Sequence, residues 1–202
     1  MFKKGFLLMI ASPSGGGKST ICREILSKNN SLCYSISWTT RVQRGEERHG
    51  KEYFFTDIIT FREKITQNYF LEYAEVHGNY YGTSKEYIDQ RLIEEKIVLL
   101  DIDVQGVNLI KDQGYNVVTI FVLPPSFKEL QTRLVNRKTD SQENIENRLK
   151  NAQIEIEKIP EYDYLVINDD LEKAVITVDN ILSAEQNKIK RYVEPIKNFY
   201  IS

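Results

Sequence analysis

The chain has 202 residues, of which 41% are hydrophobic and 28% charged, and its 27 basic and 29 acidic residues give a net charge of −2. These values exclude an intrinsically disordered chain and a globally basic nucleic-acid-binding surface, and the length suits one domain with an insertion or two small domains. Cys22 and Cys33 are too few for a disulfide framework or a zinc site, and no apolar run reaches the roughly 18 residues of a membrane span. We therefore expect a cytoplasmic protein with no nucleic-acid or membrane partner.

Short apolar runs alternate with helical patterns along most of the chain. The first run, Phe6–Ala11, ends in a glycine-rich loop, and residues 18–27 then follow a helical pattern. Further buried strands are predicted at residues 97–102, at Val117–Leu123 and at Tyr164–Ile167. Wholly apolar strands separated by helices are typical of an α/β fold with a parallel sheet that helices cover on both faces.

The helices between these strands have recognisable starts. One helix is predicted from Ser84 to about Glu95. Three more are predicted where an acceptor residue and a glutamate have the capping-box spacing, namely Ser126 with Glu129, Asp140 with Glu143, and Asp169 with Glu172. Residues 137 to about 148 are polar and carry arginines, which suits a mobile connection.

Residues 34 to about 83 differ from the rest of the chain because they are rich in aromatic residues, Thr and Gly. They contain strand-like runs at 53–55 and Phe70–Val76, and a short helix is predicted from Thr60, which has Glu63 at the capping-box spacing. We interpret residues 37–83 as a small, mostly β insertion in a core formed by residues 1–36 and 84–202.

Residues 12–19, SPSGGGKS, form a candidate phosphate-binding loop between a strand and a helix. Successive backbone N–H groups and the helix N-terminus would attract phosphate oxygens, Lys18 would reach the β- and γ-phosphates, and the Ser19 hydroxyl would bind Mg²⁺. Ser12 stands where the common motif has glycine. A GTPase is disfavoured because the nearest guanine-binding motif, NKIK at 187–190, lacks its aspartate and falls in a predicted helix. The loop, the insertion and the arginine-rich segment together point to a nucleotide kinase.

Five further blocks resemble guanylate kinases, and the match covers nearly the whole chain. They are SISWTTR (35–41), RHGKEYFF (48–55), FLEYAEVHGNYYGT (70–83), LLDIDVQG (99–106) and VINDD (166–170). The resemblance implies a P-loop kinase core, a GMP-binding insertion and a helical lid at about 134–150. It also implies the reaction ATP + GMP ⇌ ADP + GDP with Mg²⁺, and use of dGMP.

The resemblance also implies an acceptor site. The GMP phosphate would contact Arg41, Arg44, Tyr53 and Tyr81, and two guanidinium groups with two phenols suit a dianion. Guanine would contact Glu72, Ser37, Thr83 and Asp101. A carboxylate can accept hydrogen bonds from both N1–H and N2–H₂ of guanine, whereas adenine presents an acceptor at N1. Without the resemblance, Glu72 could equally face solvent on an edge strand, and the two tyrosines could be packing residues.

The donor site implied by the resemblance includes the phosphate-binding loop. ATP would contact Ser12, Pro13, Ser14, Gly15, Gly16, Gly17, Lys18, Ser19, Thr20, Arg133, Arg137 and Asn168. Lys18, Arg41, Arg137 and Arg148 would stabilise the transferring phosphoryl group. Ser19 would bind the metal, and Asp103 would lie near the metal without touching it.

Two alternatives stay open. One is a non-catalytic binding module that resembles guanylate kinase, which the intact Lys18 and Ser19 disfavour. The other is a related P-loop kinase with a different small phosphate acceptor, which Glu72 together with Ser37 disfavours. No sequence feature points to an oligomeric state.

Overall fold

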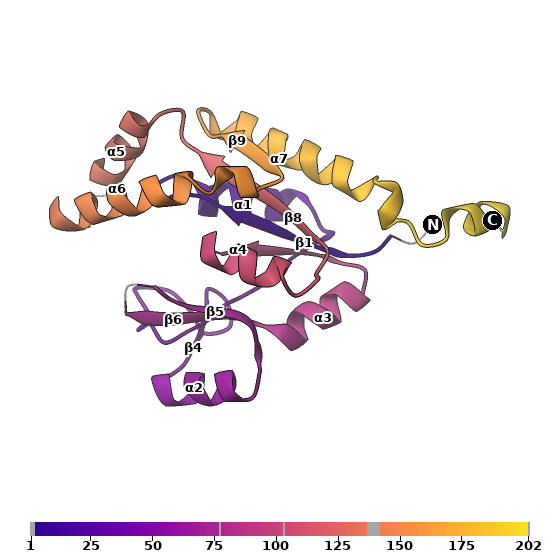
Figure 1. Ribbon diagram of the computed structural model, residues 1–202, viewed down its shortest axis with the longest axis horizontal. Helices are drawn as coiled ribbons and strands as arrows, with labels where there is room; N and C mark the ends of the chain where they lie inside the picture. The colour runs from indigo at the N-terminus through magenta and orange to yellow at the C-terminus, as the bar shows by residue number, and fades with distance from the viewer. Residues whose placement is uncertain (1–2, 77, 103, 137–141, 202) are drawn as a thin grey trace.

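The computed structural model of the chain describes residues 3–76, 78–102, 104–136 and 142–201, and it contains two sheets (Figure 1). The larger sheet has five parallel strands in the order β2-β7-β1-β8-β9. These are β1 (Phe6–Ala11), β2 (Leu32–Tyr34), β7 (Ile97–Asp101), β8 (Val117–Leu123) and β9 (Tyr164–Ile167). The predicted α/β fold with a parallel sheet flanked by helices is therefore confirmed.

Central strand β1 is wholly apolar because helices cover both faces of the sheet. Its residues Phe6, Leu8 and Ile10 pack toward α1 (Lys18–Lys28) and α7 (Leu171–Gln186). Leu7 and Met9 pack on the opposite face, toward α3 (Lys85–Ile93) and α4 (Val104–Lys111). The alternation of faces along β1 builds two core layers, and the strand holds the phosphate-binding loop at its carboxyl end.

The strands of the smaller sheet come between β2 and β7 in the sequence, and their order in the sheet is β4-β3-β6-β5. Its strands are β3 (Trp38–Thr39), β4 (Phe54–Phe55), β5 (Phe70–Val76) and β6 (Asn79–Ser84), and only the β3–β4 pair is parallel. Helix α2 (Ile58–Thr66) packs against this sheet through Phe61, whose ring stacks on Phe70 with centroids 4.5 Å apart. The insertion is thus a mixed sheet with one covering helix.

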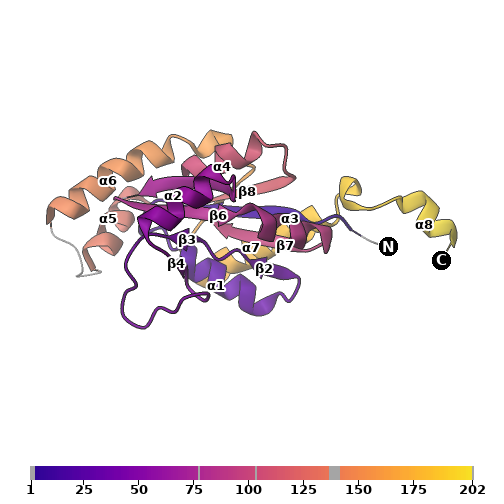
Figure 2. The same ribbon diagram turned by 90° about the horizontal axis from the view of Figure 1, so that it is seen from below.

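Helices α5 (Phe127–Asn136) and α6 (Gln142–Ile156) pack on each other at one end of the molecule (Figure 1). Their shared apolar cluster contains Leu130, Leu134, Ile145 and Ala152. Two 3₁₀ turns, η1 (Ile159–Glu161) and η2 (Ile189–Arg191), and α8 (Pro195–Ile201) complete the chain. Helix α8 extends beyond the sheets at the same end as Lys3, which pairs with Tyr192 (Figure 2). None of the helices in the described ranges has the length and hydrophobicity needed to cross a membrane.

Helix starts test the capping predictions. The Ser126 hydroxyl accepts the backbone N–H of Glu129 at 3.1 Å, and Ser84 caps α3, as predicted. The helix predicted from Thr60 begins instead at Ile58, because the Asp57 carboxylate accepts the Thr60 N–H at 2.9 Å.

Three further predictions were displaced or wrong. The helix predicted from Asp169 is capped one residue later, by Asp170. The predicted mobile connection is wrong for residues 142–148, which are helical because α6 buries an apolar face against α5. The predicted start at Asp140 lies outside the described residues. The NKIK segment follows the end of α7 and does not lie within that helix.

Candidate active site

The phosphate-binding loop joins the carboxyl end of β1 to the start of α1. Gly15 and Gly17 have φ values of +94° and +96°, which L-residues with side chains rarely adopt. Gly17 is the N-cap of α1 and has no side chain to cap it, so the first N–H groups of the helix face the loop. The geometry suits a bound anion at the helix N-terminus.

Ser12 occupies the glycine position of the common motif, and it packs closely against the main chain of Gly16. Its hydroxyl donates to the Pro13 carbonyl at 3.1 Å, and the Gly16 N–H donates to the same carbonyl at 2.9 Å. A Cβ on Gly16 would collide with the Ser12 hydroxyl oxygen. Gly16 therefore makes the space that a serine at position 12 needs.

Lys18 turns from the loop toward the carboxyl end of β7. Its Nζ lies 2.5 Å from Oδ1 of Asp101 and donates to the Ile102 carbonyl at 3.0 Å. The two charged side chains are about one-fifth exposed. Because β1 and β7 are parallel neighbours, their carboxyl ends bring together residues that are far apart in sequence.

A cavity of about 200 Å³ lies between the larger sheet and the insertion. Its lining residues are Lys18, Ser37, Tyr53, Glu72, Ala74, Val76, Tyr81, Asp101 and Ile102. The structure thus brings Lys18 to the same cavity as five of the eight residues assigned to GMP. A few convergent polar groups in a partly apolar cavity are typical of a small-molecule site.

Glu72 is buried in this cavity, with 9% of its surface exposed. Its Oε1 accepts the Thr83 hydroxyl at 2.6 Å across the β5–β6 pair. The strand register shifts between Phe70 and Glu72, so Leu71 and Glu72 are both buried although neighbouring residues of a regular strand face opposite sides. Glu72 does not face solvent, although β5 is an edge strand.

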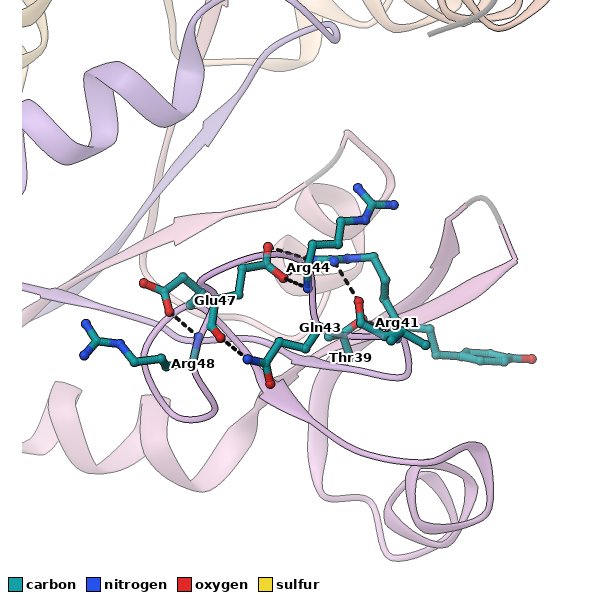
Figure 3. A network of polar contacts seen from close by, with 9 residues as sticks. Thr39, Arg41, Gln43, Arg44, Glu47 and Arg48 are labelled. Atoms are coloured by element: carbon teal, nitrogen blue, oxygen red, sulfur yellow. Dashed lines mark hydrogen bonds and ion pairs between the residues drawn. The ribbon is translucent and has the colours of Figure 1, made fainter. Parts of the chain in front are cut away.

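Arg41 lies beside the cavity in a network of polar contacts (Figure 3). Its Nη2 is 2.8 Å and 3.0 Å from the two carboxylate oxygens of Glu47, and its Nη1 donates to the Val42 carbonyl at 3.0 Å. The hydrogen bond with Glu47 raises the pKa of Arg41 and lowers the pKa of Glu47. Glu47 also accepts the backbone N–H of Arg44 at 2.9 Å. Glu47 was not predicted from the sequence, where its signal is merely an acidic residue three positions after Arg44.

Two tyrosines lie next to Arg41. The Arg41 guanidinium is 5.2 Å from the centre of the Tyr53 ring, and the Tyr53 and Tyr81 rings are 5.9 Å apart. Burial raises the pKa of Tyr53, so its hydroxyl stays protonated and able to donate. Arg44 has an exposed side chain outside the cavity lining.

The arginines of α5 and α6 contact the phosphate-binding loop and its surroundings. Arg133 pairs with Glu129 at 2.8 Å and donates to the Asn168 carbonyl at 3.0 Å. The buried Asn168 amide donates to the Gly16 carbonyl at 2.9 Å and fills the space that a side chain at position 17 would need. Arg148 of α6 lies 3.4 Å from the Ser14 hydroxyl.

The remaining predicted donor-site residues fall into two groups. Ser19 and Thr20 are exposed in the first turn of α1, beside the loop. Arg137 and Asp103 lie outside the described residues. Within the described ranges, no three acidic, histidine or cysteine side chains gather to hold a metal ion.

A family model described as guanylate kinase matches residues 4–185. The chain belongs to the guanylate kinase family. It is 42% identical over 194 residues to the guanylate kinase of Clostridium tetani, covering 96% of this chain and 93% of that protein. It is 48% identical over 185 residues to the guanylate kinase of Rickettsia typhi, covering 92% and 94%. The crystal structure of guanylate kinase from Anaplasma phagocytophilum matches with a TM-score of 0.81 at 33% identity and covers 96% and 93% of the two chains. The resemblance in the sequence blocks is confirmed.

Proposed function

We propose that this guanylate kinase family member transfers the γ-phosphoryl group of ATP to GMP, and also to dGMP, giving ADP and GDP or dGDP. The observation that carries the proposal is a single cavity containing both the buried Glu72 carboxylate and the P-loop lysine Lys18. A carboxylate suited to guanine thus lies within reach of a lysine suited to phosphates.

The acceptor site has a base end and a phosphate end. Glu72 would accept hydrogen bonds from N1–H and N2–H₂ of guanine, with Ser37, Thr83 and Asp101 around the base. Arg41, Arg44, Tyr53 and Tyr81 would bind the phosphate, because guanidinium groups and phenol hydroxyls are donors that match its oxygens. Glu72 and Tyr53 both line the cavity, and the Arg41 guanidinium lies 5.2 Å from the centre of the Tyr53 ring, which supports this division.

The donor site would use the phosphate-binding loop, residues 12–20, with Arg133, Arg137 and Asn168. Lys18 would lie at the boundary between the two substrates, and its contact with Asp101, a proposed guanine-binding residue, supports this position. Mg²⁺ would be held by the exposed Ser19 hydroxyl together with phosphate oxygens, an oxygen set that this ion prefers, and it would neutralise phosphate charge. Asp103 would lie near the ion.

The transfer needs no covalent intermediate on the protein. An oxygen of the GMP phosphate is already anionic and attacks the γ-phosphorus in line, so no general base is required. Lys18, Arg41, Arg137 and Arg148 would stabilise the charge on the transferring group. The intact Lys18 and Ser19 disfavour a non-catalytic module, and the buried Glu72 disfavours a different acceptor.

The test is an ADP-release assay with ATP and a panel of nucleoside monophosphates at equal concentrations. We expect turnover with GMP and dGMP and little with AMP, CMP or UMP. Turnover with AMP equal to that with GMP would contradict guanine selection at Glu72. A preparation that binds GMP and ATP without any ADP release would instead favour the binding module.

A further inference from the structure

An acidic side chain lies among the arginines proposed to bind the GMP phosphate. Glu47 contacts the Arg41 guanidinium with both carboxylate oxygens, and only 24% of its side chain is exposed (Figure 3). A negative charge next to a site for a dianion is unfavourable on Coulombic grounds. If GMP binds here, Glu47 must also have a favourable effect on the phosphate site that outweighs this repulsion.

Glu47 closes the loop that carries both arginines. Its carboxylate accepts the backbone N–H of Arg44, and its own N–H donates to the Arg44 carbonyl at 3.0 Å. The Gln43 amide donates to the Glu47 carbonyl. Gly45, with φ of +51°, allows the turn between the two residues. The carboxylate thus joins Arg41 to the main chain at Arg44.

The other side of Arg41 is fixed by the insertion sheet. Its backbone N–H donates to the Thr39 hydroxyl at 3.1 Å, and that hydroxyl donates to the Tyr80 carbonyl at 2.9 Å. The guanidinium lies 5.2 Å from the centre of the Tyr53 ring, and this ring lines the cavity. A guanidinium has five N–H donors in a planar fork, so it can bind a carboxylate and a phosphate oxygen at the same time.

We propose that Glu47 is a positioning residue for phosphate recognition: it orients the Arg41 guanidinium toward the cavity and fixes Arg44 beside it. The inference rests on the proposed GMP site. The opposite role is that Glu47 occupies the place of the phosphate and must be displaced by GMP. The two roles predict opposite signs, because removing a positioning group weakens GMP binding whereas removing a competitor strengthens it.

The test compares Glu47→Gln with Glu46→Gln, a matched control that removes the same charge from the exposed neighbour. Steady-state kinetics would give kcat and the KM for GMP and for ATP, and calorimetry would give Kd for GMP and for guanosine. For Glu47→Gln we expect KM and Kd for GMP to rise about 10- to 100-fold, the scale of one charge-assisted hydrogen bond. Guanosine affinity and the KM for ATP should stay within about twofold, as should every parameter of Glu46→Gln.

A second pair of variants shows whether Glu47 acts through Arg41. In an Arg41→Ala background, Glu47→Gln should weaken GMP binding much less than in the wild type, because the guanidinium it orients is gone. Glu47→Asp, whose shorter side chain cannot reach both partners, should weaken GMP binding in the same direction. Glu47→Asp also serves as the test variant in place of Glu47→Gln if thermal melting shows that Glu47→Gln does not fold.

Three results would overturn the inference: a lower or unchanged KM for GMP in Glu47→Gln, an equal loss of guanosine affinity, or an undiminished loss in the Arg41→Ala background. These failures differ from failure of the proposed function. If the wild-type protein itself did not bind GMP, the site assignment would fall. If the wild type binds GMP and the Glu47 variants bind it equally well, only the positioning role falls.

Discussion

Replacing Glu72 by glutamine tests the base site with the smallest change of shape. Glu72 is nine-tenths buried and accepts the Thr83 hydroxyl at 2.6 Å. The amide has one acceptor oxygen and one donor group. If the amide oxygen of the variant side chain faces Thr83, its NH₂ group faces the N–H groups of guanine. If the amide is in the opposite orientation, its single oxygen is the only acceptor for two guanine donors. Either orientation leaves at least one guanine donor unpaired in a buried site.

An unpaired buried donor costs about 1–3 kcal/mol, which corresponds to a decrease of about 5- to 150-fold in kcat/KM for GMP. The assay is ADP release at saturating ATP with varied GMP, repeated with inosine monophosphate, which lacks the N2 amino group. The preference of the wild type for GMP over inosine monophosphate should shrink in Glu72→Gln, because the carboxylate proposed to accept a hydrogen bond from the amino group is gone.

The control is Glu75→Gln, which removes the same charge from an exposed position of the same strand. It should leave kcat/KM for GMP within about twofold of the wild type. Equal kcat/KM values for GMP in Glu72→Gln and in the wild type would remove Glu72 from the guanine site. A melting temperature close to that of the wild type is required before any loss is attributed to the base contact.

Three further outcomes are expected. Lys18→Ala should lower kcat by about 10²- to 10³-fold while calorimetry still detects GMP binding, and a near-normal kcat would contradict the phosphate-binding loop. Trp38, whose ring stacks on Phe54 at 5.1 Å and whose neighbour Ser37 lines the cavity, should show a saturable change of fluorescence with GMP but little with AMP. GMP binding seen by calorimetry without a fluorescence change would show that Trp38 does not sense the site. Burial acts to raise the pKa of Glu185, but hydrogen bonds from Lys188, Tyr164 and Arg191 outweigh it and lower the pKa below the usual 4.5. A carboxyl group whose pKa is lowered in the folded state stabilises the protein at pH values above its unfolded-state pKa, and this stabilisation is lost as the pH falls below that pKa. Glu185→Gln should therefore lower the free energy of unfolding by about 3 kcal/mol at pH 7 and by less at pH 4. A difference measured by denaturant unfolding that does not change with pH would contradict this.

The amino-acid sequence determined the elements whose signal is contiguous. Strands β1 and β8 have the predicted bounds and are mostly buried, because an apolar run ended by glycine, proline or polar residues describes a buried strand by itself. The position of the phosphate-binding loop between β1 and α1 followed for the same reason. Strands β5 and β9 also have the predicted bounds, but the prediction that residues 164–167 form a buried strand is wrong. Strand β9 lies at the edge of the larger sheet, and its Leu165 and Ile167 are 48% and 44% exposed. Strands β2 and β3, of three and two residues, were not predicted, because such short strands depend on pairing with a neighbour.

Only the tertiary structure decided which distant residues the polar side chains of the candidate site contact. The Asn168 amide and the Gly16 carbonyl are 152 positions apart in sequence, and no local pattern encodes their hydrogen bond. Likewise, Lys18 meets Asp101 because parallel strands bring their carboxyl ends to one edge. Glu72 is buried because the register shifts along β5, an event that depends on the pairing with β6. Glu47 is close in sequence to Arg41, but its contact depends on a turn at Gly45 that is visible only once the chain is folded. Residue type and spacing fix which chemistry is available, and the pairing of distant strands and the path of the loops fix which groups meet.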